Sequence, residues 1–307
     1  MNKNKYLICK CKENNFKTQN EIKISLLIKK INGYELFFSP ILDSEFYSFE
    51  NLTYKINNDN SIFIYYSKNI KNPDLEFFIN ERKFDFLINN FNLIKNNIYL
   101  LVKNKLVHFN INDKNIILND KNIILKDKNE SIESNQFLII NFENSFCFDW
   151  ISNNNIKFYF GNLINSSNYH FPLECLFISY LSNNINNNLT KEIINSLIRD
   201  YLNKNSNIFK SVSNEFLIDY EDKSKDFFYK FINYERIEII SKLINFWDSW
   251  DLFSLSLLYL NILNSNTYNN SNTSNNSNTF LTENILLNIN PEPKLRPLFF
   301  NSLERKD

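Results

Sequence analysis

Glycine is almost missing from this chain of 307 residues, which contains only Gly33 and Gly161. A loop that cradles phosphate groups needs several glycines close together, because side chains would keep the backbone away from the phosphates. Two distant glycines cannot build such a loop. The sequence therefore excludes both the P-loop of nucleotide hydrolases and the Rossmann dinucleotide fingerprint.

Metal-binding cysteine patterns are also missing. The chain has four cysteines, and the closest two, Cys9 and Cys11, are separated by one residue, too few for a CxxC pair. The other two, Cys147 and Cys175, stand alone in the sequence. We therefore expect reduced thiols in an intracellular protein.

The chain has no excess charge and no long apolar run. Its 34 Lys and Arg residues balance 34 Asp and Glu residues, so the formal net charge is zero. This balance predicts no binding to nucleic acid and none to an anionic membrane. The most apolar stretch, near Leu252–Leu263, is shorter than the roughly 20 residues that span a bilayer. A soluble protein with no membrane contact is the expectation.

Apolar residues are plentiful, at 43% of the chain, with 16% aromatic, enough for a packed core. Alternating patterns predict strands in the first half and periodic patterns predict helices. The strands are expected at Lys5–Lys12, Leu36–Leu42, Ser61–Lys68, Ile116–Leu118, Ile123–Leu125 and Phe137–Phe142. Helices are expected at Glu21–Ile31 and over most of Asp74–Leu106.

The second half is predicted to be mainly helical. Thr190 is expected to cap a helix over Thr190–Leu202, and Phe227–Ile244 is expected to be another helix. Phe246–Leu263 is apolar on nearly every face, which indicates a buried central helix. The Asn-rich stretch Asn264–Asn278 is expected to be a disordered loop. Small strands followed by helices predict an α+β fold.

Five short motifs follow one another in an informative order. They are His108-Phe109-Asn110 with Asn115, Asn141-Phe142-Glu143, Pro172-Leu173-Glu174, Asp251-Leu252-Phe253-Ser254-Leu255-Ser256 and Pro291-Glu292-Pro293-Lys294-Leu295-Arg296-Pro297. This series resembles the H-R-D-L-x-x-x-N, D-F-G and A-P-E signatures of protein kinases, with the start of the central helix and a C-terminal arginine motif after them. From about Lys5 to Arg296, the chain is similar to divergent kinase-like proteins of large DNA viruses.

The resemblance implies a bilobal protein-kinase-like fold in a single domain over residues 1–307. A small, reduced, β-rich N-lobe would cover residues 1–70, and a large helical C-lobe would cover residues 71–307. The distance from Glu174 to Asp251 is longer than is usual in the family, which predicts a helical insert at about 178–245. The disordered Asn-rich loop would lie at 264–279.

The resemblance also implies functional positions. Asn110 stands at the catalytic aspartate and Asn112 at the catalytic-loop lysine, while Asn115 and Asn141 stand where kinases bind magnesium. The pair that positions the ATP phosphates would be formed with Glu21. Its lysine is expected to be Lys10, or Lys12 as the alternative on the same strand face. Because Asn115 and Asn141 are neutral, any ATP and Mg²⁺ would be held weakly.

The substitutions remove charge where the family's chemistry needs it. An amide cannot act as a general base near neutral pH, and it holds a cation more weakly than a carboxylate does. Asp113 is a conceivable substitute carboxylate. Its place three residues after Asn110, however, predicts that its side chain points away from the catalytic position. Glu143 replaces the glycine of D-F-G and brings a new carboxylate near the site.

The architectural positions are retained. The resemblance implies that His108 packs in the core and that Phe142 lies beneath the helix carrying Glu21. It implies that Asp251 accepts hydrogen bonds from the catalytic-loop backbone. It also implies a buried ion pair between Glu174 and Arg296.

These expectations favour a pseudokinase that acts by binding a protein partner and that retains at most weak nucleotide binding. The enzyme alternative is a weakly active, divergent serine/threonine kinase that transfers the γ-phosphate of ATP, since positioning supplies much of that catalysis. The third alternative is a helical structural protein in which the motifs arise by chance. The resemblance to viral proteins places the chain in a host cytoplasm or a virion.

Overall fold

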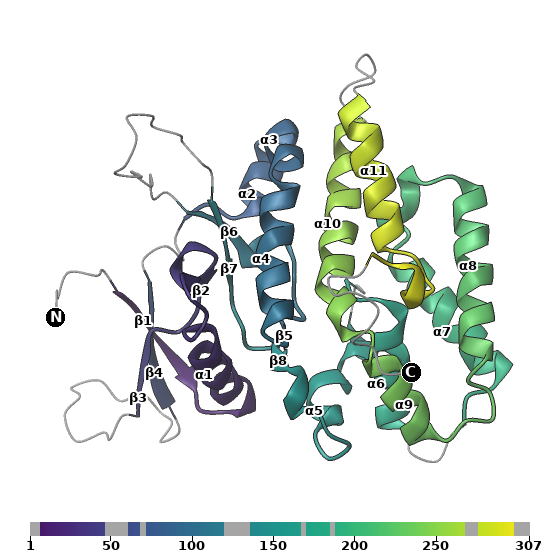
Figure 1. Cartoon of the computed structure of the whole chain (residues 1–307), viewed down its shortest axis with the longest axis horizontal. Helices are drawn as coiled ribbons and strands as arrows, with labels where there is room; N and C mark the ends of the chain where they lie inside the picture. Colours follow the sequence, from purple (N-terminus) through teal and green to yellow (C-terminus); the bar gives the residue numbers. More distant parts are fainter. Residues whose placement is uncertain are drawn as a thin grey trace.

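The computed structural model describes residues 7–46, 61–67, 72–119, 136–166, 170–184, 188–267 and 276–297. Its described part is an α+β structure with small sheets and many helices; the helices up to residue 103 lie beside the sheets, and the later helices form a separate group (Figure 1). No helix in these ranges has both the length and the apolar character needed to cross a membrane.

A three-stranded antiparallel sheet forms the N-terminal part. Its order is β1 (Leu7–Glu13), β4 (Ser61–Ser67) and β3 (Asp43–Phe46). Alternate residues of β4 are buried and form a small apolar cluster, because successive side chains of a strand point to opposite faces. The cluster contains Ile41, Ile62, Ile64 and Tyr66.

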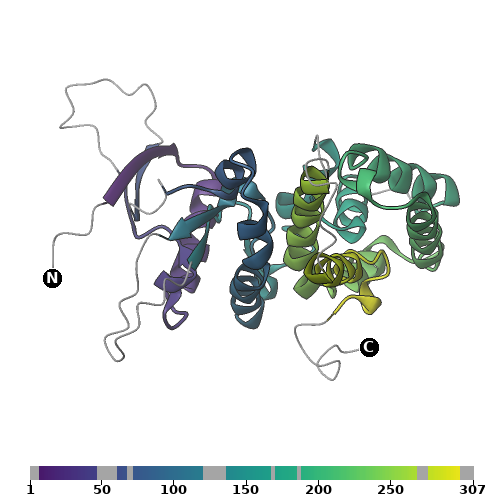
Figure 2. The ribbon, with the colours of Figure 1, turned by 90° about the horizontal axis from the view of Figure 1, so that it is seen from above.

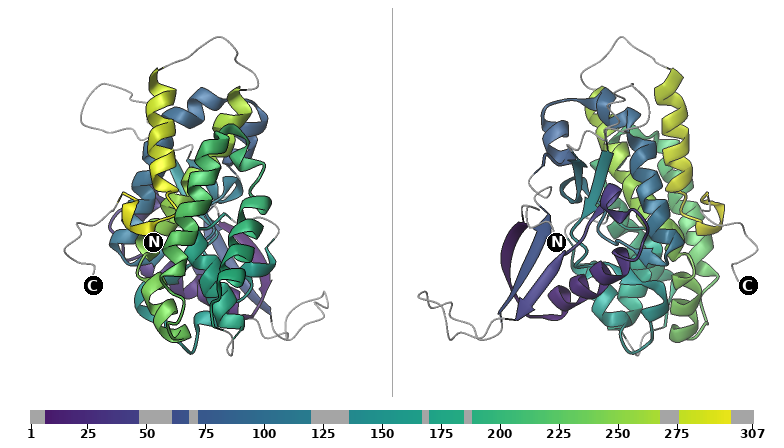
Figure 3. Two further views of the ribbon diagram at one scale, coloured as in Figure 1. Left: turned by 90° about the vertical axis from the view of Figure 1, so that its right-hand side faces the viewer. Right: turned by 60° about the vertical axis from the view of Figure 1, so that its left-hand side comes forward.

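Helix α1 (Phe16–Ile28) lies beside this sheet (Figure 3). Ile22 packs on the sheet cluster, whereas Ile24 and Ile28 belong to the main core. The helix begins earlier than the predicted Glu21, because the Asn15 side chain accepts a hydrogen bond from the Thr18 N–H and caps it. It therefore joins the sheet to the rest of the molecule.

Two further small sheets occupy the middle of the chain. One has the order β2 (Phe38–Ser39), β7 (Gln136–Ile140) and β6 (Ile116–Asn119), and the other pairs β5 (Leu106–Val107) with β8 (Phe146–Cys147). The helices beside them are α2 (Leu75–Asn80), α3 (Phe84–Asn89) and α4 (Phe91–Lys103).

The remaining helices gather on the other side of α4 (Figure 2). They are α5 (Ile156–Phe160), α6 (Leu173–Asn183), α7 (Lys191–Lys204), α8 (Asn214–Tyr229), α9 (Arg236–Ile244), α10 (Trp250–Thr267) and α11 (Asn276–Asn288). The predicted cap at Thr190 is confirmed, because its side chain accepts a hydrogen bond from the Ile193 N–H. The predicted buried central helix is confirmed as α10, in which every residue from Leu252 to Leu260 is buried. It begins at Trp250 rather than at the predicted Phe246, because Trp247–Ser249 forms a 3₁₀ turn.

Several predicted boundaries are wrong. Leu36–Leu42 contains only the two-residue strand β2, because the chain first makes a 3₁₀ turn at Tyr34–Leu36. Phe227–Ile244 is not one helix: α8 ends at Tyr229 and α9 begins at Arg236. Between them Asn233 has a φ of 76°, which a continuous right-handed helix does not allow.

The predicted disordered loop at 264–279 is wrong at both ends, and residues 268–275 lie outside the described part of the chain. Helix α10 continues to Thr267 and α11 already begins at Asn276, so the predicted range of 264–279 includes helix at both ends. Asparagine has a modest helix propensity, and tertiary packing overrides it at Asn264, which is buried. The predicted strand Ile123–Leu125 lies outside the described residues.

Candidate functional site

Asp251 fixes the loop that follows β5. This buried carboxylate, in the first turn of α10, accepts hydrogen bonds from the N–H groups of His108 (2.6 Å) and Phe109 (2.8 Å). These are the backbone contacts that the resemblance implies. Burial raises the pKa of Asp251 to about 6, and the two N–H donors counteract part of this rise. Phe109 has a φ of 60°, a strained conformation for a bulky residue that these bonds help to hold.

His108 is buried and neutral in this loop. Its Nε2 lies 2.9 Å from the Ile140 carbonyl oxygen, and its Nδ1 accepts a hydrogen bond of 3.3 Å from the Asn110 N–H. These partners require the proton on Nε2. Burial lowers the pKa of His108 to about 4, and the hydrogen bond to Ile140 offsets part of this effect. Its role is therefore packing and hydrogen bonding, as the resemblance implies.

The four predicted amides lie together and bind one another. Asn115 Nδ2 donates to the Asn110 carbonyl oxygen (2.9 Å), and Asn141 Nδ2 donates to Asn115 Oδ1 (3.2 Å). Asn112 Nδ2 donates to Asn110 Oδ1 (3.0 Å), while Asn112 Oδ1 caps the 3₁₀ turn Asp113–Asn115. We call Asn110, Asn112, Asn115 and Asn141 the amide cluster.

The amide cluster is held together by internal hydrogen bonds. Its amides are neutral, and in the described part of the chain no group of three or more His, Cys, Asp or Glu side chains could hold a metal ion. Asn115 and Asn141 are the residues whose side-chain oxygens could contact a cation, and the Asn115 oxygen already accepts a hydrogen bond. Such a cation would be bound weakly, since no ligand carries charge.

Asp113 is the acidic residue within the loop that carries Asn110, Asn112 and Asn115. It begins the 3₁₀ turn that Asn112 caps, and burial together with the nearby charge of Glu76 raises its pKa. Among the described residues, no hydrogen bond joins the Asp113 side chain to Asn110.

Lys12, not Lys10, forms the ion pair with Glu21. The prediction of Lys10 is wrong, and the alternative prediction of Lys12 is confirmed. Lys12 Nζ lies 2.8 Å from Glu21 Oε2, and the Tyr66 hydroxyl donates to the same carboxylate at 3.2 Å. Lys10 is exposed, with its Nζ over the Tyr66 ring. Lys12 lies closer to the end of β1, where the chain turns into α1 and Glu21 becomes reachable.

The charge of Lys12 is stabilised by this pairing. Burial alone would lower its pKa, but the carboxylate of Glu21 and the Tyr66 hydroxyl raise it well above its ordinary value. Glu21 itself is almost completely buried, so Lys12 and Tyr66 are the partners that its carboxylate has in place of water.

Phe142 and Glu143 follow Asn141 of the amide cluster and contact different parts of the molecule. The Phe142 ring is buried and lies 5.1 Å from the His108 ring and 6.3 Å from the Phe38 ring, measured between centroids. The next residue, Glu143, has a carboxylate oxygen 3.8 Å from Lys12 Nζ. Asn141, which precedes them, has a φ of 65° and so turns the chain sharply at this point.

Glu174 and Arg296 form the buried ion pair that the resemblance implies. Arg296 Nη1 and Nη2 donate to the two Glu174 oxygens at 2.7 and 2.9 Å. Arg296 Nε also donates to the Asn290 carbonyl oxygen at 2.7 Å, and its guanidinium lies over the Phe253 ring. The pair joins the start of α6 to the segment after α11, and it is structural rather than part of the amide cluster.

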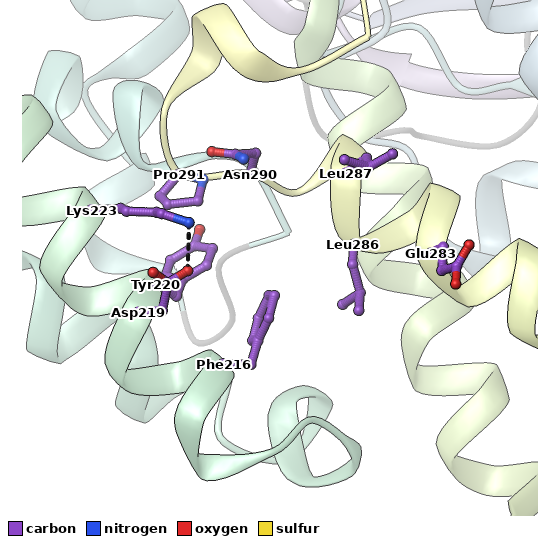
Figure 4. A pocket seen from close by; sticks show the side chains of 9 residues that line it. All are labelled: Phe216, Asp219, Tyr220, Lys223, Glu283, Leu286, Leu287, Asn290 and Pro291. Atoms are coloured by element: carbon purple, nitrogen blue, oxygen red, sulfur yellow. Dashed lines mark hydrogen bonds and ion pairs between the residues drawn. The ribbon is translucent and has the colours of Figure 1, made fainter.

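A separate pocket of about 430 Å³ lies between α8 and α11 (Figure 4). None of its lining residues is a predicted site residue. Asp219 and Lys223 form an ion pair of 2.7 Å in its wall. The lining residues are Phe216, Asp219, Tyr220, Lys223, Glu283, Leu286, Leu287, Asn290 and Pro291.

Sequence reasoning missed Tyr66 and Asn20 as members of the site. Tyr66 is on β4 and reaches Glu21, while Asn20 on α1 binds the backbone after Phe142. Tyr66 belongs to an alternating strand and Asn20 to an Asn-rich chain, so neither stands out in the sequence. Only the packing of β4, α1 and the turn after β7 brings them together.

Comparison with known proteins adds no family to these observations. No protein-family model matches the chain, and no curated protein is significantly similar to it.

Proposed function

We propose that this protein is a pseudokinase: a protein-kinase-like scaffold that has lost phosphoryl transfer and acts by binding a protein partner. The observation that carries the proposal is the amide cluster, in which Asn110 and Asn141 take the positions of the two aspartates that kinases need. The Asn110 side chain accepts a hydrogen bond from Asn112, and the Asn141 side chain donates one to Asn115.

Three contacts support the kinase-like part of the proposal. The Lys12–Glu21 pair corresponds to the lysine–glutamate pair of kinases, which joins a strand to a helix. Asp251 binds the loop backbone at His108 and Phe109, and Glu174 binds Arg296. The last two contacts join residues distant in sequence that belong to the matched motifs.

In this proposal the bilobal division follows the sheets and helices. The sheet β1–β4–β3 with α1 forms the reduced N-lobe, and the elements from α2 onward form the C-lobe. Helices α7, α8 and α9 fall within residues 178–245 and form the predicted insert. An insert of this kind offers additional surface for the partner, while its buried side chains pack into the main core.

The enzyme alternative is a weakly active serine/threonine kinase, which the intact Lys12–Glu21 pair favours. In kinases this pair positions the phosphates, and positioning supplies much of the rate. The loss of both carboxylates removes the group that accepts the substrate proton and the principal charge that binds magnesium. We therefore place this alternative second.

Transfer of the γ-phosphate tests the proposal directly. The purified chain is incubated with radiolabelled ATP, Mg²⁺ or Mn²⁺, and generic protein substrates, beside the double variant Asn110→Asp/Asn141→Asp. We expect no transfer by the unaltered chain above a protein-free control. Magnesium-dependent phosphorylation by the unaltered chain would refute the pseudokinase, and activity of the double variant alone would support it.

A further inference from the structure

Lys12 faces two carboxylates rather than one. Its Nζ lies 2.8 Å from Glu21 Oε2 and 3.8 Å from Glu143 Oε2. One positive and two negative formal charges leave the trio with a net charge of −1. The two carboxylates therefore already balance the positive charge of Lys12 before any anion binds.

The position of Glu143 is fixed by its backbone. Asn20 Nδ2, on α1, donates to the carbonyl oxygens of Glu143 (3.2 Å) and Ser145 (2.6 Å). The Ser145 hydroxyl donates in turn to the His108 carbonyl oxygen (2.9 Å). These bonds hold the turn that carries Glu143 against the helix that carries Glu21, so Glu143 stays within reach of Lys12.

The two carboxylates differ in their access to solvent. The Glu21 side chain is 2% exposed, whereas those of Glu143 and Lys12 are 31% and 26% exposed. The Tyr66 hydroxyl also holds Glu21, while the ion pair of Glu143 is longer. Glu143 is therefore the partner of Lys12 that a ligand entering from solvent would have to replace.

We propose that Glu143 is an intramolecular competitor for the anion site at Lys12 and makes this site select against phosphates. The inference rests on the proposed function, in which the scaffold would present Lys12 to the phosphates of a nucleotide. A phosphate at Lys12 would lie close to the Glu143 carboxylate, and like charges at such distances repel strongly when they are partly buried. Phosphate binding then requires Glu143 to move away from Lys12.

Isothermal titration with inorganic tripolyphosphate and with Mg·ATP tests this specificity. We compare the unaltered chain with Glu143→Gln, which removes the charge and keeps the shape. Glu238→Gln is the matched control, because Glu238 forms a surface ion pair of similar length, 3.6 Å, with Lys242 on α9. We expect Glu143→Gln to bind both ligands at least about tenfold more tightly, and Glu238→Gln to match the unaltered chain.

A triple variant tests whether the increase in phosphate affinity depends on the Lys12–Glu21 pair. Adding Lys12→Gln and Glu21→Gln to Glu143→Gln removes the buried pair without leaving either charge alone. We expect this variant to lose the added affinity. Equal affinity of Glu143→Gln and the unaltered chain, including no binding by either, would overturn the proposal, as would a gain that survives in the triple variant.

This outcome is independent of the transfer assay. Phosphorylation by the unaltered chain would refute the pseudokinase, whereas the titration measures binding and involves no transfer. The two proposals can therefore fail separately.

Discussion

At the scale of single residues, the site is defined by which groups carry charge. Asn110 and Asn141 have neutral amide side chains, and Glu143 has a carboxylate 3.8 Å from Lys12 Nζ. In the proposed function, the two amides stand where a kinase has carboxylates, and Glu143 stands where a kinase has glycine. On that proposal, both differences act against the binding and transfer of phosphate.

The titration of His108 is a residue-scale prediction. The chain has two histidines, so His170→Gln leaves one imidazole for observation by NMR. We expect the folded protein to titrate with a pKa of about 4, against 6.5 for an ordinary histidine, because burial disfavours the imidazolium. The same variant in urea is the control and should titrate near 6.5. A folded-state pKa near 6.5 would contradict the buried, neutral ring.

This pKa has a consequence for stability with a definite sign. Because the folded-state pKa lies below that of the unfolded chain, His108 contributes fully above pH 6.5, and the contribution is lost as the pH falls towards 4. The full difference is about 3 kcal/mol in the free energy of unfolding. Asp251 acts in the opposite direction over an overlapping range, since its pKa is raised to about 6. Following the His108 imidazole directly by NMR distinguishes its titration from that of Asp251.

At the scale of elements, single polar side chains fasten segments that are distant in sequence. Asp251 of α10 holds the loop after β5, and Asn20 of α1 holds the turn after β7. Arg296 joins the segment after α11 to Glu174 at the start of α6. Local sequence patterns define these helices, but the polar contacts set how they are placed.

Arg296→Ala is an element-scale prediction. It leaves the buried Glu174 carboxylate without its charged partner, which typically costs about 3–5 kcal/mol. We expect a loss of this size in the free energy of unfolding, measured by urea titration. The control is Lys242→Ala, which breaks an exposed pair on α9 and should cost at most about 1 kcal/mol. Similar losses for the two variants would show that the Arg296 pair does not fasten these elements.

At the scale of the whole molecule, one apolar core extends from the N-terminal helix to the C-terminal helices. Ile24 of α1, Leu257 of α10 and Ile285 of α11 belong to the same cluster of buried residues. The sheet β1–β4–β3 has a separate small cluster, yet α1 packs on both. The two parts are therefore connected by packing as well as by the Lys12–Glu21 pair.

Cooperative unfolding is the prediction at this scale. Ile24→Ala and Leu257→Ala each open a cavity in the shared core, and each should lower the free energy of unfolding by about 2–5 kcal/mol. We expect both to shift the same transition, followed by Trp fluorescence and by circular dichroism. Ile237→Ala is the control, since that side chain is 51% exposed and should change stability little. A separate early transition caused by Ile24→Ala alone would show that α1 and the sheet unfold independently.

The sequence alone determined the type of most elements and the residues that carry or lack charge. An apolar run on nearly every face predicted α10 as the buried helix, and the residue type of Thr190 predicted a cap, because these signals depend only on neighbours a few residues apart. The motif order predicted the contacts of Asp251 and the Glu174–Arg296 pair. The absence of carboxylates at Asn110 and Asn141 was readable directly.

Only the tertiary structure decided which side chains meet. It selected Lys12 over Lys10, since both alternate onto one face of β1 and the distance to Glu21 depends on how α1 packs on the sheet. The predicted helix Phe227–Ile244 is two helices in the structure, α8 and α9. The turn at Asn141 places the Glu143 carboxylate near Lys12. Each of these outcomes depends on the relative placement of separate elements, which no local pattern encodes.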